Sequence, residues 1–165
     1  MAHVYVSIGS NIDKEINIPS SINELEKQYG PLEISNIYET KAVGFEGDDF
    51  YNLVVGFQSN DSPNEISQKL KEIELNHDRT RGKEQFDSRT LDLDQLLYDD
   101  LVMHMDSVNI PHSDILRYNF VLKPLAEIAG DVMHPEEHKS IHELWCAAEK
   151  NGEMRIVNFE FNQCK

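Results

Sequence analysis

Two aspartates separated by one residue are the side chains in this sequence best placed to do chemistry. Asp92 and Asp94 lie in the stretch Arg89–Tyr98, in which polar and apolar residues alternate. Side chains two residues apart in a β-strand share a face, so both carboxylates point the same way. The residues expected on the opposite face, in a core, are Leu91, Leu93 and, if the alternation persists, Leu97. Paired carboxylates suit Mg²⁺ and a polyphosphate, but the same pattern is typical of a strand face that meets water.

The distribution of charge favours the phosphate interpretation. The chain has 30 acidic and 15 basic residues and a formal net charge of −15, so it repels nucleic acid and anionic membranes. A phosphate site must therefore be built locally from clustered cations. Such a cluster directly precedes the aspartates, and it consists of Arg79, Arg81, Lys83 and Arg89.

The composition is that of an ordinary globular protein. The 165 residues, 39% hydrophobic and 27% charged, predict a single domain covering residues 1–165. The sequence contains neither an apolar run of about 20 residues nor a signal peptide, so we expect a cytoplasmic protein without a membrane span. The two cysteines lack the spacing of a metal site or a disulfide framework.

Hydrophobic periodicity predicts an α+β fold. The expected order is a strand at 3–8, a helix at 19–29, strands at 32–40 and 50–58, a helix at 63–77 and a strand at 89–98. This is the ferredoxin-like β-α-β-β-α-β order, an antiparallel sheet with helices on one face. The last sixty or so residues predict a C-terminal elaboration with helices at 120–129 and 140–150 and a strand at 155–159.

Three residues admit both a structural and a functional interpretation. Asn52 interrupts an apolar strand, and a buried amide must be hydrogen-bonded, either to a neighbouring loop or to a polar ligand. Glu74 lies near a helix C-terminus, where it opposes the helix dipole unless a cation or a ligand is nearby. Gly9 serves either a turn or the close approach of a ligand to the backbone. The loop 41–49 is either a surface connection or a lid.

A resemblance to a known family joins these features. The segment Ser88–Leu97 resembles the signature of the 6-hydroxymethyl-7,8-dihydropterin pyrophosphokinases of folate biosynthesis. Further segments resemble that family's motifs in the same order, from about Val4 to Ala129. They are Ile8–Asn11, Tyr38–Thr40, Phe50–Asn52, Ile73–Glu74, Arg79–Arg81, Pro111–His112, Phe120–Leu122 and Pro124–Ala129.

The resemblance implies an ATP-dependent diphosphotransferase. It implies transfer of pyrophosphate from ATP to the 6-hydroxymethyl group of a reduced pterin, with AMP as the second product. Asp92 and Asp94 would hold two Mg²⁺ ions that bridge the triphosphate, and Arg81 and Arg89 would contact the phosphates during catalysis. The expected ATP-binding residues are Glu74, Arg81, Arg89 and His112.

On the pterin side, the resemblance implies that Asn52 reads the amide edge of the ring. Thr40 and Val43 would contribute their backbone, while Phe120 and Phe50 would stack on the two faces of the ring. ATP and the pterin would be the partners, with no nucleic acid and no membrane, and we expect a monomer.

The sequence departs from the family pattern mainly on the ATP side. Tyr118 stands where the family commonly has arginine, Ser113 follows His112, and Phe86 replaces a residue that is often tryptophan. These changes lead us to expect an active enzyme that either binds ATP less tightly or has differently arranged lid loops. Two alternatives are a non-catalytic pterin- or nucleotide-binding relative of the same fold, and another metal enzyme that uses the aspartate pair. AMP release that depends on the pterin would distinguish them.

Overall fold

The computed structural model describes residues 1–41, 49–78, 91–105, 107–150 and 152–157. The strands are β1 (Ala2–Ser10), β2 (Glu33–Ile34), β3 (Ile37–Thr40), β4 (Phe50–Ser59), β5 (Asp92–Tyr98), β6 (Met103–His104), β7 (Asn109–Ile110) and β8 (Arg155–Val157). The helices are α1 (Lys14–Tyr29), α2 (Pro63–Asp78), α3 (Asp114–Arg117), α4 (Asn119–Ala129) and α5 (Ile141–Ala147).

Antiparallel pairing places β1 between β4 and the edge strand β5. The strand order is β5-β1-β4-β3-β8, β2 also pairs with β4, and β6 and β7 form a separate hairpin. When β2 and β3 are counted as one interrupted strand, the neighbouring strands β5, β1, β4 and β3 lie in the ferredoxin-like order. The predicted fold class is therefore confirmed. The C-terminal β8 adds one strand beside β3.

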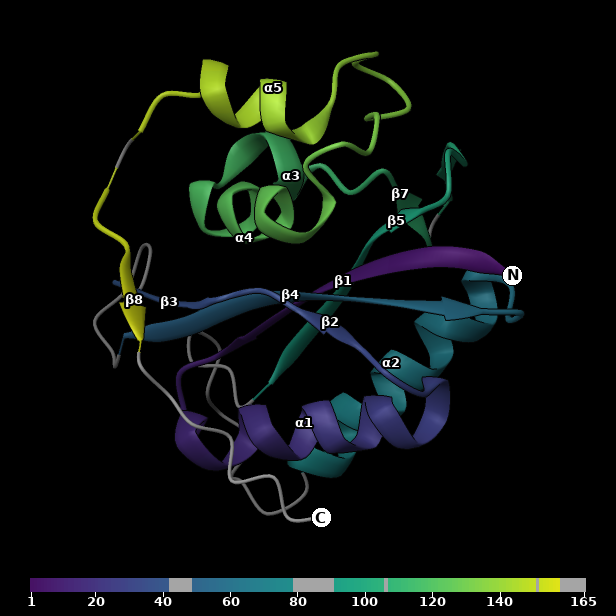
Figure 1. The fold of residues 1–165 in the computed structure, drawn as a ribbon. Coiled ribbons are helices and arrows are strands. Elements are labelled where there is room, and N and C mark those ends of the chain that lie inside the picture. Colours follow the sequence, from purple (N-terminus) through teal and green to yellow (C-terminus); the bar gives the residue numbers. More distant parts are fainter. Residues whose placement is uncertain (42–48, 79–90, 106, 151, 158–165) are drawn as a thin grey trace.

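Helices cover both faces of the sheet. Apolar side chains of α1 and α2 pack on one face, in a core that includes Ile18, Leu25, Leu70 and Leu93. On the other face, α3, α4 and α5 form a second core around Val54 (Figure 1). The prediction of helices on one face therefore holds for the ferredoxin-like part alone, because the C-terminal elaboration buries the opposite face.

Several helix and strand boundaries in the structure differ from those predicted from the sequence. The first helix begins at Lys14 rather than at residue 19, and Pro19 lies inside it. The strand predicted at 32–40 is split into β2 and β3, because Ser35 turns its hydroxyl to accept a hydrogen bond from the Val54 backbone at 2.9 Å. Ser62 and Glu65 form the expected capping box at the start of α2.

A bulge in β5 overturns one core assignment. The register with β1 shifts between Tyr5 and Val6, so Leu96 is an extra residue on β5. Leu93 packs with α1 and α2 as predicted, but Leu97 packs with α4 on the other face. The alternation that places the aspartates therefore ends at Gln95, one residue after Asp94.

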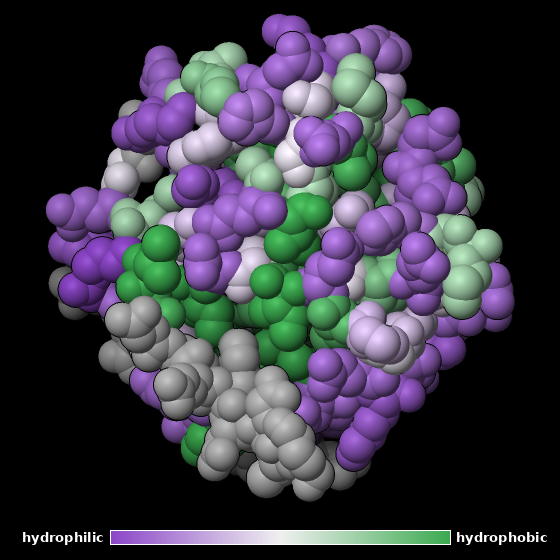
Figure 2. Space-filling view, viewed as in Figure 1, coloured by the Kyte–Doolittle hydropathy of each residue, from purple (hydrophilic) through white to green (hydrophobic). Residues whose placement is uncertain are grey.

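The surface is mostly hydrophilic on the face seen in Figure 2, with apolar residues gathered at the level of the sheet. In the described part of the chain, no helix combines the length and apolar character needed to cross a membrane.

Candidate functional site

The site is organised by one row of residues that crosses three adjacent strands near the C-terminal end of β1 and the N-terminal ends of β4 and β5. Gly9 on β1 lies opposite Asn52 on β4 and opposite Asp92 on β5. Directly opposite residues in antiparallel strands project on the same face. Tyr5, on the same face of β1, packs with α4, so the row faces the α3–α4 layer. Asn52 and Asp92 are two strand spacings apart, about 10 Å.

The carboxylate of Asp94 meets a histidine from the segment after β7. Asp94 lies opposite Ser7, on the same face as Asp92. The His112 backbone donates a hydrogen bond to the Leu96 carbonyl at 3.0 Å, which fastens this segment to β5. The His112 Nε2 atom then lies 3.9 Å from Asp94 Oδ1. The fold therefore places His112 beside Asp94, and its predicted role in ATP binding stays a prediction.

Asp114 is a site residue that the sequence interpretation missed. Its backbone N–H donates to His112 Nδ1 at 3.1 Å, so the proton of a neutral imidazole resides on Nε2, the atom that faces Asp94. Asp94, His112 and Asp114 can each offer one ligand atom within 4.8 Å of the others. The available signal was the spacing of Asp114, two residues after His112.

Glu74 reaches the outer edge of β5. One of its carboxylate oxygens accepts a hydrogen bond from the Leu93 backbone at 2.7 Å. Burial raises the pKa of Glu74 to about 7; the nearby Asp92 carboxylate also raises this pKa, while the hydrogen bond from Leu93 opposes the shift. The position of Glu74 near the end of α2 is thus explained by a partner on β5, and it brings a second carboxyl group to Asp92.

A cavity of about 270 Å³ joins these groups at the open edge of β5. Its walls come from α2, β5 and the segment before and after β7. The lining residues are Ser67, Leu70, Lys71, Glu74, Asp92–Gln95, Ser107–Asn109 and His112. It therefore brings together Glu74, Asp92, Asp94 and His112, all four of the described residues that the sequence assigned to ATP or metal.

The predicted pterin residues lie at the other end of the row. Asn52 is 8% exposed as a whole residue, and its Nδ2 donates to Thr40 Oγ1 at 2.9 Å. Phe50 lies opposite Thr40 in the pairing of β3 with β4. A Cβ atom on Gly9 would come within 3.1 Å of Asn52 Oδ1, so only glycine leaves the amide its full space. The buried asparagine is hydrogen-bonded, as expected.

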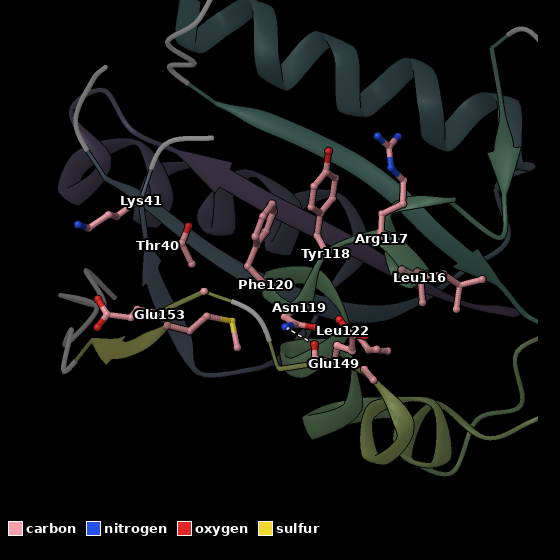
Figure 3. A pocket seen from close by; sticks show the side chains of 14 residues that line it. Thr40, Lys41, Leu116, Arg117, Tyr118, Asn119, Phe120, Leu122, Glu149 and Glu153 are labelled. Carbon is pink, nitrogen blue, oxygen red and sulfur yellow. Dashed lines mark hydrogen bonds between the residues drawn. The ribbon is translucent and has the colours of Figure 1, made fainter. Parts of the chain in front are cut away.

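A larger cavity, of about 540 Å³, lies between the α3–α4 junction and the segment after α5 (Figure 3). Thr40 and Phe120 both line it, together with Tyr118, Glu149 and Met154 among others. Phe120 is half-buried in the first turn of α4. The fold thus places Phe120 and Thr40 on one cavity, whereas Phe50 and Asn52 are outside its lining.

Three predicted site residues, Arg81, Arg89 and Val43, lie outside the described residues. The basic cluster before β5 and most of the loop 41–49 also fall there, so their assignments stay predictions from the sequence.

The chain is similar to known proteins in sequence and in fold. The model of the family described as 7,8-dihydro-6-hydroxymethylpterin-pyrophosphokinase matches residues 5–130. The chain is 36% identical over 148 residues to the 2-amino-4-hydroxy-6-hydroxymethyldihydropteridine pyrophosphokinase of Aquifex aeolicus, covering 87% of this chain and 91% of that one. It is 33% identical over 132 residues to the protein of the same name from Bacillus subtilis, covering 78% of each.

Longer proteins contain a similar segment. The folic acid synthesis protein fol1 of Pneumocystis carinii is 35% identical over 141 residues, covering 84% of this chain but 19% of that protein. Among solved structures, the Plasmodium falciparum HPPK-DHPS triple mutant with SDX-DHP superposes with a TM-score of 0.70 at 14% identity. The match covers 88% of this chain and 41% of that one, and it supports the fold alone.

Proposed function

The chain belongs to the 7,8-dihydro-6-hydroxymethylpterin-pyrophosphokinase family, and on that premise we propose how its own residues divide the reaction between them. The enzyme transfers a pyrophosphoryl group from ATP to 6-hydroxymethyl-7,8-dihydropterin in folate biosynthesis. We assign ATP to the 270 Å³ cavity beside β5 and the pterin to the side of Asn52, Thr40 and Phe120.

The observation that carries this assignment is the row Asn52–Gly9–Asp92. It supports a pterin held at β4 and a triphosphate held at β5, with the backbone of Gly9 between them. The hydroxymethyl oxygen must approach the β-phosphorus of ATP in line with the leaving AMP oxygen. Two binding regions about 10 Å apart on one rigid sheet favour that approach.

The donor set beside β5 fits a hard divalent cation. Asp92 and Asp94 offer carboxylate oxygens on one face of β5. Glu74 lies beside Asp92, and Asp114 and His112 lie beside Asp94. Burial is the main cause of the raised pKa of Glu74, and the neighbouring Asp92 carboxylate adds to it, so a cation bound beside Asp92 would favour the ionised form of Glu74. We propose that Asp92 and Asp94 hold Mg²⁺, and the family resemblance of the sequence predicts two ions. Bound Mg²⁺ would neutralise the charge of the triphosphate and lower the pKa of the attacking hydroxyl.

In this proposal, each predicted site residue binds either the pterin or the phosphates of ATP. Asn52, oriented by Thr40, hydrogen-bonds the amide edge of the pterin, and Phe120 and Phe50 stack on its ring. His112 presents its Nε2–H to the phosphates beside Asp94. Arg81 and Arg89 contribute charge-assisted hydrogen bonds to the transferred group. The hydroxyl proton passes to water as the hydroxymethyl oxygen forms its bond to the β-phosphorus. The bond between the β-phosphorus and the AMP oxygen breaks, and AMP leaves.

The direct test is AMP release from ATP by the purified chain with Mg²⁺, with and without 6-hydroxymethyl-7,8-dihydropterin. We expect AMP in stoichiometric amounts with the pterin diphosphate, and background AMP when the pterin is omitted. AMP or phosphate release independent of the pterin would overturn the assignment in favour of another metal enzyme. Pterin binding without AMP release would indicate a non-catalytic relative.

A cytoplasmic location and a monomeric state complete the proposal. Both rest on the sequence, and sedimentation of the purified chain would test the second.

A further inference from the structure

Two aromatic rings and a guanidinium form a stack at the junction of α3 and α4. The rings of Tyr118 and Phe120 are stacked, with centroids 4.8 Å apart and an interplanar angle of 17°. The guanidinium carbon of Arg117 lies 5.3 Å from the centroid of the Tyr118 ring. Figure 3 shows Tyr118 between Arg117 and Phe120, with Phe120 on the side of Thr40. The nearly parallel planes make Tyr118 a flat support for one face of Phe120.

The backbone makes this support rigid. Tyr118 ends α3 and caps α4 in an extended conformation, with φ −126° and ψ 125°. Its carbonyl accepts hydrogen bonds from the backbones of Val121 and Leu122 at 3.1 and 3.0 Å. Val121 and Leu122 are each 4% exposed and pack in the core under α4. The two rings therefore project from a helix start that is fixed by both hydrogen bonds and burial.

The stacked rings of Tyr118 and Phe120 form part of the wall of the cavity shown in Figure 3. Tyr118, Phe120 and Thr40 all line the space of about 540 Å³, and Thr40 is the hydrogen-bond partner of Asn52. Phe120 is only half-buried, so without a neighbour its ring would be free to rotate about its side-chain bonds. A ring that must stack on a flat ligand gains affinity when its plane is fixed beforehand, because less entropy is lost on binding.

We propose that Tyr118 is a positioning residue for the pterin: its ring fixes the plane of Phe120, and Phe120 stacks on the substrate. The inference rests on the proposed role of Phe120 and deepens it. Arg117, which is exposed, supports the Tyr118 ring by a cation–π contact. Tyr118 touches neither ATP nor the reacting atoms in this proposal, so its effect appears in pterin affinity.

The experiment compares Tyr118→Leu and Tyr118→Gln, which remove the ring, with Tyr118→Phe, which keeps it. Calorimetry gives the Kd of 6-hydroxymethylpterin and, separately, the Kd of a non-hydrolysable ATP analogue with Mg²⁺. We expect both ring-removing variants to weaken pterin binding about three- to tenfold. Tyr118→Phe should restore the Kd to within about twofold, and all three variants should bind the ATP analogue like the wild type. KM for the pterin should rise while kcat stays within about twofold.

Phe120→Leu separates this inference from the function on which it rests. If Phe120→Leu leaves the pterin Kd unchanged, the proposed role of Phe120 fails. If Phe120→Leu weakens binding but both ring-removing variants at 118 match the wild type, the positioning role alone is overturned. In the Phe120→Leu background, Tyr118→Leu should have little further effect, because its partner is gone. Equal losses of pterin and ATP affinity would indicate a general structural defect and would also overturn the proposal.

Discussion

At the scale of single residues, the aspartate pair carries the sharpest prediction. Asp92→Asn and Asp94→Asn keep size and shape but remove the charge that would hold a cation beside β5. We expect each to lower kcat for AMP release by roughly 10²- to 10³-fold, the range typical for loss of one electrostatic contact to a transition state. Pterin affinity should stay within about threefold, because Asn52 and Phe120 come from other elements. Steady-state rates and calorimetric Kd values measure the two effects.

A matched control lies just beyond the same strand. Asp100 is exposed in the turn after β5, so Asp100→Asn makes the same chemical change away from the site. It should keep wild-type kcat and Kd. Wild-type rates in both Asp92→Asn and Asp94→Asn at saturating Mg²⁺ would instead remove the pair from the mechanism.

The alternation of Arg89–Tyr98 was enough to place both aspartates on one face, because the side-chain period of a strand is two. The alternation of residues did not predict that Glu74 accepts a hydrogen bond from the Leu93 backbone. Its carboxylate meets the outer backbone edge of β5, and that contact depends on how α2 packs beside the sheet. Asp114 was missed for a related reason, since its backbone N–H is what orients His112.

At the scale of elements, the close packing of β1 against β4 leads to a prediction for Gly9. Gly9 lies between Asn52 and Asp92, and an added Cβ atom would lie 3.1 Å from Asn52 Oδ1. Gly9→Ala should displace the amide by a few tenths of an ångström and weaken pterin binding about tenfold, equivalent to ~1.4 kcal/mol. Calorimetric titration with 6-hydroxymethylpterin measures this change.

Ser7→Ala is the control for Gly9→Ala, because it alters the next position on the same face of β1, opposite Val54 and Asp94. Its pterin Kd should match that of the wild type. An unchanged Kd in Gly9→Ala would mean that the amide of Asn52 does not read the ligand.

A buried histidine in the connection between α4 and α5 should make the free energy of unfolding depend on pH. His134 is 2% exposed, and its Nδ1 accepts hydrogen bonds from the backbones of Glu136 and Glu137 at 3.2 and 3.0 Å. Burial lowers the pKa of His134 below its usual 6.5; His138 also lowers it, while Glu137 and Glu136 oppose the shift. The unfolded chain therefore binds this proton more readily, so the stabilisation present above about pH 6.5 is lost as the pH falls below that value.

Urea unfolding of the wild type and of His134→Asn at about pH 7.5 and 5.5 checks this. Asparagine can keep an acceptor for the two backbone donors but does not titrate. The wild type should lose more unfolding free energy between the two pH values than the variant, because only the wild type carries the His134 imidazole that titrates. Parallel losses would show that other groups control the pH dependence.

Element order was predictable because period and capping signals are local, as at Ser62 and Glu65. The break between β2 and β3 and the bulge at Leu96 were not, because each depends on pairing with a distant strand. The face covered by α4 was also missed: apolar residues such as Val54 and Leu97 were visible in the sequence, but their partners come from the last third of the chain.

At the scale of the whole molecule, the net charge of −15 dominates, and it destabilises the compact state by self-repulsion. Raising NaCl from about 20 mM to about 300 mM shortens the screening length from roughly 20 Å to about 6 Å. We expect Tm to rise by roughly 2–4 °C, the change that about 1 kcal/mol produces in a domain of this size. Thermal scans in NaCl and in KCl should agree, because screening depends on ionic strength. A fall in Tm with salt would mean that attractive pairs such as Lys69–Asp61, joined at 2.7 Å, outweigh the repulsion.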